Sequence, residues 1–148
     1  MSRLQQTRPL LGALGAVMLF AAVGCGDLNG QSLEGGILER TDNGAFAVLL
    51  EAEHLGDTEL GEFFLTVAMP DPSDPDSVAW IVPGAVVDVE VLDDGDVVAQ
   101  AAGLTATDGG RHALDAIPVL SGAGPWTFEI QITVDEQVSD SVVFRATP

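Results

Sequence analysis

The stretch GGRHALDAIPVLSGAGPWTFEIQITV, residues 109–134, decides the fold that this sequence predicts. It reads as a β-strand, a corner rich in Gly and Pro, and a second strand that Trp126 opens. Along the second strand two sets of side chains alternate, the apolar Trp126, Phe128, Ile130, Ile132 and Val134 and the polar Thr127, Glu129, Gln131 and Thr133. Because successive side chains of a strand point to opposite faces, this alternation predicts one face in a core and one in water.

Further segments of strand length follow the same pattern. The apolar residues of 62–69 fall on one face, and three valines alternate with acidic residues in 86–92. Asp94-Gly95 lies between that run and the apolar run 97–101. An Asp-Gly pair between two such runs predicts a tight hairpin, since glycine accepts the positive φ of the turn.

With residues 45–53 and 141–146 the count reaches about seven strands, and no convincing helix follows residue 25. The sequence therefore predicts an all-β fold, an antiparallel immunoglobulin-like (Ig-like) β-sandwich. A single cysteine excludes a disulfide between the sheets, so we expect Trp80, Trp126, the phenylalanines and the valines to fill the core. Residues 70–76, PDPSDPD, contain three prolines, which predicts an acidic loop there.

The amino terminus has the pattern of a secretory signal peptide. Arg3 and Arg8 supply positive charge, and residues 10–23 form an uncharged apolar run. Crossing a bilayer takes about 18–20 apolar residues, so this run is too short for a membrane-spanning helix and is typical of a signal sequence.

The residues that end this run, Ala22-Val23-Gly24-Cys25, resemble the lipobox of bacterial lipoproteins. The resemblance implies that Cys25 is acylated and becomes the first residue of the mature protein. We therefore expect a lipoprotein signal peptide at 1–24, a lipidated flexible tether at 25–44 and an Ig-like β-sandwich domain at 45–148. Within the tether, Leu33, Ile37 and Leu38 could still add a short edge strand to the domain. Gly26, rather than an aspartate, follows the cysteine. In the sorting rule of some Gram-negative lipoproteins this favours the outer membrane over the inner one, with the domain facing the periplasm.

The charge of the chain excludes several kinds of partner. It has 23 acidic and 5 basic residues, none of them lysine, and a net charge of −18. Cleavage before Cys25 leaves Arg40, Arg111 and Arg145, and a net charge of 3 − 23 = −20. Such a surface repels phosphate backbones and anionic lipid headgroups. We therefore expect no nucleic-acid partner, and attachment to the membrane through the acyl chains on Cys25.

Three segments of the predicted sandwich resemble YtkA-like and FixH-like Ig-fold domains of bacterial envelope proteins. They are Pro83-Gly84-Ala85-Val86-Val87, Gly110-Arg111-His112 and Gly124-Pro125-Trp126-Thr127-Phe128, with His112 where the group has tyrosine. The resemblance covers residues 45–147 and implies a link with copper handling or with assembly of respiratory oxidases. Metal-associated members carry Met- and His-rich segments between the middle strands, whereas residues 92–96 here are Leu-Asp-Asp-Gly-Asp.

Few side chains of the mature sequence suit a metal ion. Copper prefers thioether and imidazole ligands, and the chain offers only His54, His112 and Met69, far apart in sequence. Met69 shares a face with core residues and His112 holds an aromatic position, so packing is the simpler role for both. Calcium prefers carboxylates, which two acidic turns supply: Asp93, Asp94 and Asp96, and Asp71, Asp74 and Asp76. Aspartate favours turns on its own account, so a solvated turn is the simpler interpretation of each set.

Catalysis has no more support in the sequence. The chain has no lysine and no tyrosine, its serines have no base nearby in sequence, and no Gly-rich segment precedes a helix. We therefore expect no enzymatic activity, no cofactor and no metal site, and Cys25 as the one modified residue. The predicted function is a membrane-tethered, non-enzymatic interaction or accessory module of the bacterial cell envelope, with an unknown protein partner. The alternative is a periplasmic metal-handling domain for copper or calcium.

Overall fold

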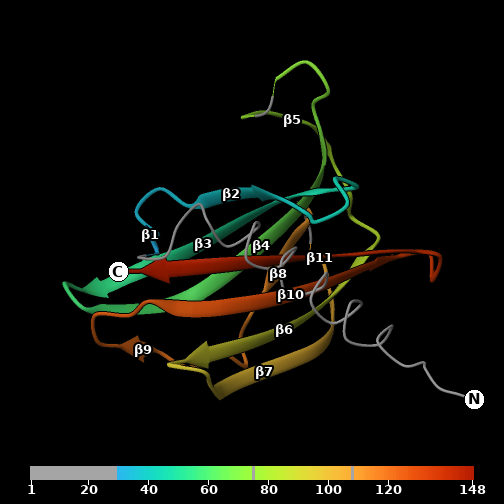
Figure 1. Cartoon of the computed structure of the whole chain (residues 1–148). Helices are drawn as coiled ribbons and strands as arrows, with labels where there is room; N and C mark the ends of the chain where they lie inside the picture. Colours follow the sequence, from blue (N-terminus) through green and yellow to red (C-terminus); the bar gives the residue numbers. More distant parts are fainter. Residues whose placement is uncertain (1–29, 75, 108) are drawn as a thin grey trace, which may run out of the picture.

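The computed structural model describes residues 30–74, 76–107 and 109–148 (Figure 1). These residues form eleven β-strands in two sheets and confirm the predicted all-β fold class. The expected signal peptide, residues 1–24, and the expected lipidation site Cys25 lie outside the described residues. Within the described ranges no helix has the length and hydropathy needed to span a bilayer.

A five-stranded sheet forms one layer of the sandwich. Its strand order is β1-β11-β10-β6-β7, and all neighbours are antiparallel except β1 and β11. The strands are β1 (Gln31–Ser32), β6 (Ala85–Asp93), β7 (Asp96–Thr105), β10 (Trp126–Val134) and β11 (Val138–Thr147).

A six-stranded sheet forms the other layer, with antiparallel ladders in the order β2-β3-β4-β5. Two short strands, β8 and β9, pair with β4 along the edge that β5 also uses. The strands are β2 (Ile37–Arg40), β3 (Ala47–Gly56), β4 (Glu59–Pro70), β5 (Val78–Ile81), β8 (Arg111–Ala113) and β9 (Leu120–Ser121).

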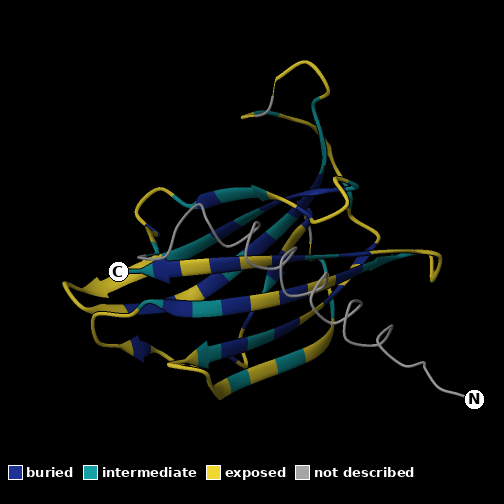
Figure 2. Ribbon diagram, viewed as in Figure 1, coloured by how far each residue is buried: buried dark blue, intermediate teal, exposed yellow. Residues whose placement is uncertain are grey.

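The core lies between the two sheets, where the alternation of the sequence places it. Along β10 the side chains of Trp126, Phe128, Ile130 and Ile132 are at most 2% exposed, and Figure 2 shows the alternation of buried and exposed residues along this strand. From the opposite sheet, Phe63 of β4 meets Phe128 with ring centroids 5.5 Å apart. Full burial of one such side chain contributes about 1.5–3 kcal/mol. The predicted core role of Trp126 is confirmed.

The β6–β7 hairpin has the predicted two-residue turn. Asp93 pairs with Asp96, and between them Asp94 and Gly95 have φ angles of 52° and 87°. Positive φ at both central residues is the mark of a type I′ turn, whose twist matches that of the flanking strands. The Asp-Gly pair therefore determines this connection.

The sandwich begins earlier in the chain than the expected boundary at residue 45. β1 pairs with β11, β2 pairs with β3, and the side chains of Leu33 and Ile37 are 1% and 4% exposed. Burial of these two side chains holds residues 31–44 on the domain, although the sequence predicts a flexible tether there. Four strands were not among the segments that the sequence pattern predicts, namely β1, β2, β5 and β9. Each has two to four residues, too few to show the alternation of apolar and polar side chains that marks a strand.

Trp80 does not lie in the core, contrary to the expectation from the sequence. Its side chain is 64% exposed on β5, whereas that of Trp126 is 2% exposed. The end of β4, the following loop and β5 project beyond the sandwich as a hairpin, residues 69–81, which we name the β4–β5 arm (Figure 1). Figure 2 shows that most of this arm is exposed, because the opposite sheet does not extend beneath it.

The three segments that carry the family resemblance each lead into a strand. Pro83-Gly84 precedes β6, Gly110 precedes β8, and Gly124-Pro125 precedes β10. Gly110 has a φ of 80°, and a Cβ atom there would lie 2.4 Å from Cγ2 of Ile81. The glycine therefore allows the start of β8 to pass close to the base of the β4–β5 arm.

Candidate functional site

The structure keeps the three candidate copper ligands apart along β4. His54 of β3 pairs with Leu60, near the start of β4. His112 of β8 pairs with Leu65 in its middle, and Met69 is near its end. Nine residues separate Leu60 from Met69, roughly 30 Å at the rise of a strand. Among the described residues, no three His, Cys, Asp or Glu side chains gather in a group able to hold a metal ion.

His112 is a buried link between the two sheets. Its side chain is 0% exposed, and Nε2 lies 2.8 Å from the carbonyl oxygen of Ala85 on β6. Nδ1 lies 3.3 Å from the carbonyl oxygen of Leu65 on β4. Through its Nε2–H the ring donates a hydrogen bond to the Ala85 carbonyl, from one sheet to the other. The packing role that the sequence favours for His112 is confirmed.

The carboxylates of residues 71–76 hold the turns of their own loop. Asp71 Oδ1 accepts hydrogen bonds from the hydroxyl and the N–H of Ser73, at 2.7 and 2.8 Å. These two hydrogen bonds hold the pKa of Asp71 below its ordinary value. Asp74 Oδ1 accepts the N–H of Asp76 at 3.0 Å. Contacts of this kind are the reason that aspartate is favourable in turns, so Asp71 and Asp74 have a structural role here.

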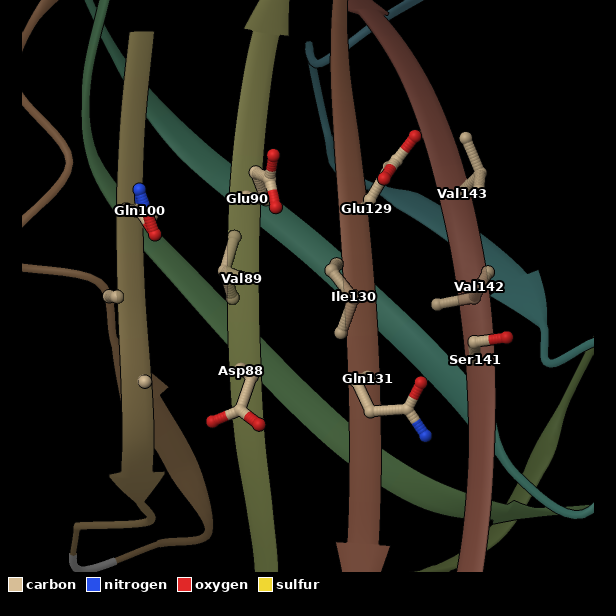
Figure 3. A pocket seen from close by; sticks show the side chains of 12 residues that line it. Asp88, Val89, Glu90, Gln100, Glu129, Ile130, Gln131, Ser141, Val142 and Val143 are labelled. Carbon is tan, nitrogen blue, oxygen red and sulfur yellow. The ribbon is translucent and has the colours of Figure 1, made fainter. Parts of the chain in front are cut away.

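The outer face of the five-stranded sheet is acidic. Glu90 of β6 and Glu129 of β10 are direct cross-strand neighbours, and Asp88 lies opposite Gln131. Figure 3 shows these side chains side by side on the shallow surface between β7 and β11. Like charges directly opposite one another destabilise a sheet. The negative charge of these carboxylates also makes this face unfavourable for anionic ligands and for a second acidic surface.

The β7 edge of that sheet is interrupted by two bulges in β7. The register between β6 and β7 shifts at Val98 and again at Ala102-Gly103. Gly103 has a φ of 66°, and its N–H donates to Asp88 Oδ1 at 2.7 Å. Bulges interrupt the row of free backbone groups that an added strand needs. Although Val97 and Val98 are about half exposed, this edge is a poor template for strand pairing.

Arg40 holds the β4–β5 arm in place. Its Nη2 donates to the carbonyl oxygens of Asp71 and Asp74, at 2.9 and 3.3 Å. Within the loop, the N–H of Asp71 donates to the carbonyl of Ser77 at 3.2 Å, and the N–H of Ser77 donates to that of Asp74 at 3.3 Å. The guanidinium therefore ties the arm to the edge strand β2, which orders the arm without a partner.

The arm carries a cluster of exposed apolar side chains. All four residues of β5 are exposed, with Val78 at 40%, Trp80 at 64% and Ile81 at 44%. Trp80 pairs with Met69 and Ile81 pairs with Ala68, so the two side chains lie on opposite faces of the arm. Tryptophan is highly buried on average in folded proteins. The exposed indole on a projecting hairpin is therefore the most unusual surface feature of the described residues.

One face of the arm borders an apolar depression on the outer face of the six-stranded sheet, which we name the outer hollow. Its volume is about 520 Å³. Arg111 lies at its margin, where the guanidinium stacks 4.0 Å above the Phe64 ring and Nη2 lies 3.4 Å from Glu51 Oε2. The apolar lining includes Leu38, Leu49, Ala68, Val78 and Ile81.

The sequence pattern does not predict this arm, although one signal points to it. Prolines at 70, 72, 75 and 83 enclose the apolar run Val78-Ala79-Trp80-Ile81-Val82. Prolines disfavour the interior of a sheet, so an apolar run enclosed by them favours an edge strand or a projecting hairpin over a central strand.

No protein-family model matches the chain, and no curated protein or solved structure is significantly similar to it. The candidate site is therefore defined by the geometry of its own residues. It consists of the β4–β5 arm with Trp80 and of the outer hollow beside it.

Proposed function

We propose that this chain is a non-enzymatic interaction module of the bacterial cell envelope, and that its β4–β5 arm contacts another protein. The observation that carries the proposal is the side chain of Trp80, 64% exposed on a projecting hairpin. Covering an aromatic side chain removes about 150–250 Å² from water, and Trp is enriched among the residues that dominate binding energies. In the free protein the indole of Trp80 stays in water, so the free energy of burying it is gained only when a partner covers it.

The order of the arm supports the same proposal. Arg40 fixes the loop through two backbone carbonyl groups, and Asp71 and Asp74 fix its turns. Ordering of side chains and loops on binding costs about 0.5–1.5 kcal/mol for each immobilised side chain. These contacts already order the arm in the free protein. Binding a partner therefore requires little further loss of conformational entropy in the arm.

We further propose that Cys25 is acylated and holds the sandwich at the membrane, as the resemblance to a lipobox implies. Five residues separate Cys25 from β1, and an extended segment of that length spans at most roughly 18 Å. β1 pairs with the end of β11, whereas the arm joins the start of β6, where Ala85 pairs with Val134 at the end of β10. The two features lie at opposite ends of the sandwich (Figure 1). An anchor on Cys25 therefore directs the arm away from the lipid and towards partners in the periplasm.

The resemblance to YtkA-like and FixH-like domains is part of the proposal. Its three segments lead into β6, β8 and β10, which are positions that a sandwich needs for its architecture. The proposed module is thus a domain of this kind whose contact surface is the β4–β5 arm.

Photocrosslinking in the native cells tests the proposed function. Benzoylphenylalanine at position 80 replaces one large aromatic side chain by another. The same residue at position 143 is a matched control, since Val143 is 49% exposed on the five-stranded sheet. We expect a discrete protein adduct from position 80 and none from position 143. No adduct from position 80, or the same adducts from both positions, would contradict the proposal.

A further inference from the structure

We infer that Asn43-Gly44, in the turn between β2 and β3, is a modification site that the fold protects. In the closed turn Asn43 is held against deamidation, and deamidation after local opening prevents the turn from closing again. This inference is independent of the proposed contact through the β4–β5 arm. It starts from the sequence, in which both asparagines, Asn29 and Asn43, precede a glycine. Asn29 lies outside the described residues, whereas the surroundings of Asn43 are described.

Deamidation of an Asn-Gly pair is a reaction of the chain with itself and with water. The backbone nitrogen of the glycine attacks Cγ of the asparagine and forms a C–N bond. The Cγ–Nδ2 bond breaks, and the proton of the glycine N–H leaves with the side-chain nitrogen as ammonia. The cyclic imide then takes up one water molecule and opens to an aspartyl or an isoaspartyl residue. Glycine favours this ring closure because it has no Cβ atom that hinders the attacking nitrogen.

Hydrogen bonds of the closed turn engage both reacting groups of this pair. The nucleophile, the backbone nitrogen of Gly44, donates its N–H to the carbonyl oxygen of Thr41 at 2.8 Å. The leaving group, Nδ2 of Asn43, donates to Asp140 Oδ1 at 3.1 Å. Because a carboxylate only accepts hydrogen bonds, the amide nitrogen and not the amide oxygen faces Asp140. Ring closure therefore requires that the turn first lose both contacts.

Burial does not protect the pair, so these hydrogen bonds determine its reactivity. Asn43 and Gly44 are both exposed, and a Cβ atom at Gly44 would have no neighbour within 4 Å among the described residues. Water therefore reaches the side chain even when the turn is closed. The rate of deamidation then depends on the fraction of molecules in which the turn is open. Such local opening takes less free energy than unfolding of the whole domain.

Neither product of the reaction fits the closed turn. Asp140 accepts the backbone N–H groups of Asn43 and Ala45 as well as the side chain of Asn43. An aspartyl residue at position 43 replaces the side-chain donor by a second carboxylate, and two carboxylates in contact repel each other. An isoaspartyl residue adds one atom to the main chain between the two N–H groups, so they no longer match one carboxylate.

The consequence of the modification falls on the start of the sandwich. The turn 41–46 connects β2 to β3. It is held against β11 by Asp140 and by the N–H of Asp42, which donates to the carbonyl oxygen of Ser141 at 2.8 Å. A chain modified at position 43 keeps the buried core between the sheets but loses the contacts to Asp140. We therefore expect a folded but less stable domain.

Peptide mapping by mass spectrometry separates Asn43 from Asn29 and measures the rate of deamidation at each site in the purified protein. We expect Asn43 to react at least about a hundredfold more slowly in native buffer than in concentrated urea, because an ordered segment is open for only a small fraction of the time. In urea the fold protects neither site, so the two Asn-Gly pairs should react at similar rates. Equal rates for Asn43 in native buffer and in urea would contradict the protection.

Variants separate opening of this turn from unfolding of the whole domain. Asp140→Ala removes the acceptor of Asn43 and should speed its deamidation in native buffer at least about tenfold, the effect of losing a hydrogen bond. Asp140→Asn, which keeps the shape of the side chain, should act in the same direction. His112→Ala is the matched control, since it opens a cavity in the core and its hydrogen-bond partners, Leu65 and Ala85, lie outside the turn. In this variant we expect less than about a threefold change. Acceleration equal to that in Asp140→Ala would assign the reaction to global unfolding and overturn the role of Asp140.

The effect of the product is measured in the variant Asn29→Gln, in which Asn43 is the one remaining Asn-Gly site. After deamidation in urea and return to native buffer, we expect a lower urea midpoint than for the same variant after brief exposure to urea. Asn43→Asp gives the aspartyl product directly. Its midpoint should lie below that of Asn43→Ala, which loses the side-chain donor without adding a charge, and the difference should shrink below about pH 4 as the carboxylates take up protons. A deamidated chain with an unchanged midpoint, or Asn43→Asp as stable as Asn43→Ala, would show that the turn closes again and overturn the inference.

Discussion

The carboxylate of Asp140 accepts the backbone N–H of Asn43 with both of its oxygens, at 3.1 and 3.2 Å. It also accepts the N–H of Ala45 at 3.2 Å and that of Ser141 at 2.9 Å, and its side chain is 3% exposed. Asp140 belongs to β11 of the five-stranded sheet, whereas Asn43 and Ala45 belong to the turn between β2 and β3 of the other sheet. One buried carboxylate therefore joins the two layers beside the core.

Asp140→Ala removes the acceptor of these N–H groups and leaves a small cavity. Because a buried donor without a partner costs about 1–3 kcal/mol, we expect a loss of about 2–3 kcal/mol in the free energy of unfolding. Urea denaturation measures it. Asp115→Ala, at an exposed carboxylate in the turn after β8, is the control and should change stability by less than about 0.5 kcal/mol. Equal effects of the two substitutions would remove Asp140 from this role.

The stability that Asp140 contributes depends on pH. Burial by itself raises the pKa of Asp140, but hydrogen bonds from the Thr41 side chain and from three backbone N–H groups lower it more, so the pKa lies below its ordinary value. The unfolded chain has a pKa of about 3.9 at this residue. A carboxyl with a lower pKa in the folded state stabilises the fold above that value, and this contribution is lost as the pH falls through the folded pKa.

We therefore expect the stability difference between the wild type and Asp140→Asn to stay constant from about pH 5 to 8 and to shrink below about pH 4. Urea midpoints measured at a series of pH values give this difference directly. A difference that grows on acidification would show that the folded pKa is raised instead of lowered.

His112 gives a prediction that separates packing from metal binding. His112→Ala opens a cavity and leaves the Ala85 carbonyl without its donor, so we expect a loss of about 2–4 kcal/mol. His112→Phe avoids the cavity, although its ring is somewhat larger, and loses the hydrogen bond, for which about 1–2 kcal/mol is expected. Urea denaturation ranks the variants, and equilibrium titration with copper accompanies it. Micromolar copper binding that disappears in His112→Ala would favour the metal-handling alternative.

Much of the sandwich is predictable because its decisive patterns are local. The alternation from Trp126 to Val134 and the Asp94-Gly95 turn each fit within one strand or one connection, and the structure reproduces both. Asp140 shows how an error in a predicted strand boundary conceals a buried side chain. It shares the inward face of β11 with Val142 and Phe144, but a strand that starts at residue 141 leaves it in a loop.

The candidate site is less predictable because it depends on the relative lengths of strands that are far apart in the sequence. Residues near Trp80 have an apolar composition that suits a core strand. Whether they are covered depends on how far β4 runs past the opposite sheet, and no periodicity within the segment records that length. Leu33 and Ile37 show the converse, since a glycine-rich segment with only two buried apolar side chains still joins the domain.

The proposed anchor gives a prediction that depends on Cys25 alone. In native cells we expect the wild-type chain in the membrane fraction and labelled by a radioactive fatty acid. Cys25→Ala should incorporate no label and leave the membrane fraction, because residues 10–23 are too short to span a bilayer. Trp80→Ala is the control and should remain labelled and membrane-bound. A Cys25→Ala variant that fractionates like the wild type would contradict lipidation at this residue.

The two tryptophans of the chain predict opposite effects on stability. Trp126 is 2% exposed and fills the core, so Trp126→Ala should cost about 3–5 kcal/mol in the free energy of unfolding. Trp80 is 64% exposed and has no opposite sheet beneath it, so Trp80→Ala should change that free energy by less than about 0.5 kcal/mol. Urea denaturation measures both values. In the matched variants Trp80→Phe and Trp126→Phe, fluorescence should show a buried indole in the first and a solvated one in the second. A loss of more than about 2 kcal/mol in Trp80→Ala would make Trp80 a structural residue, and the arm would lose its place as the contact site.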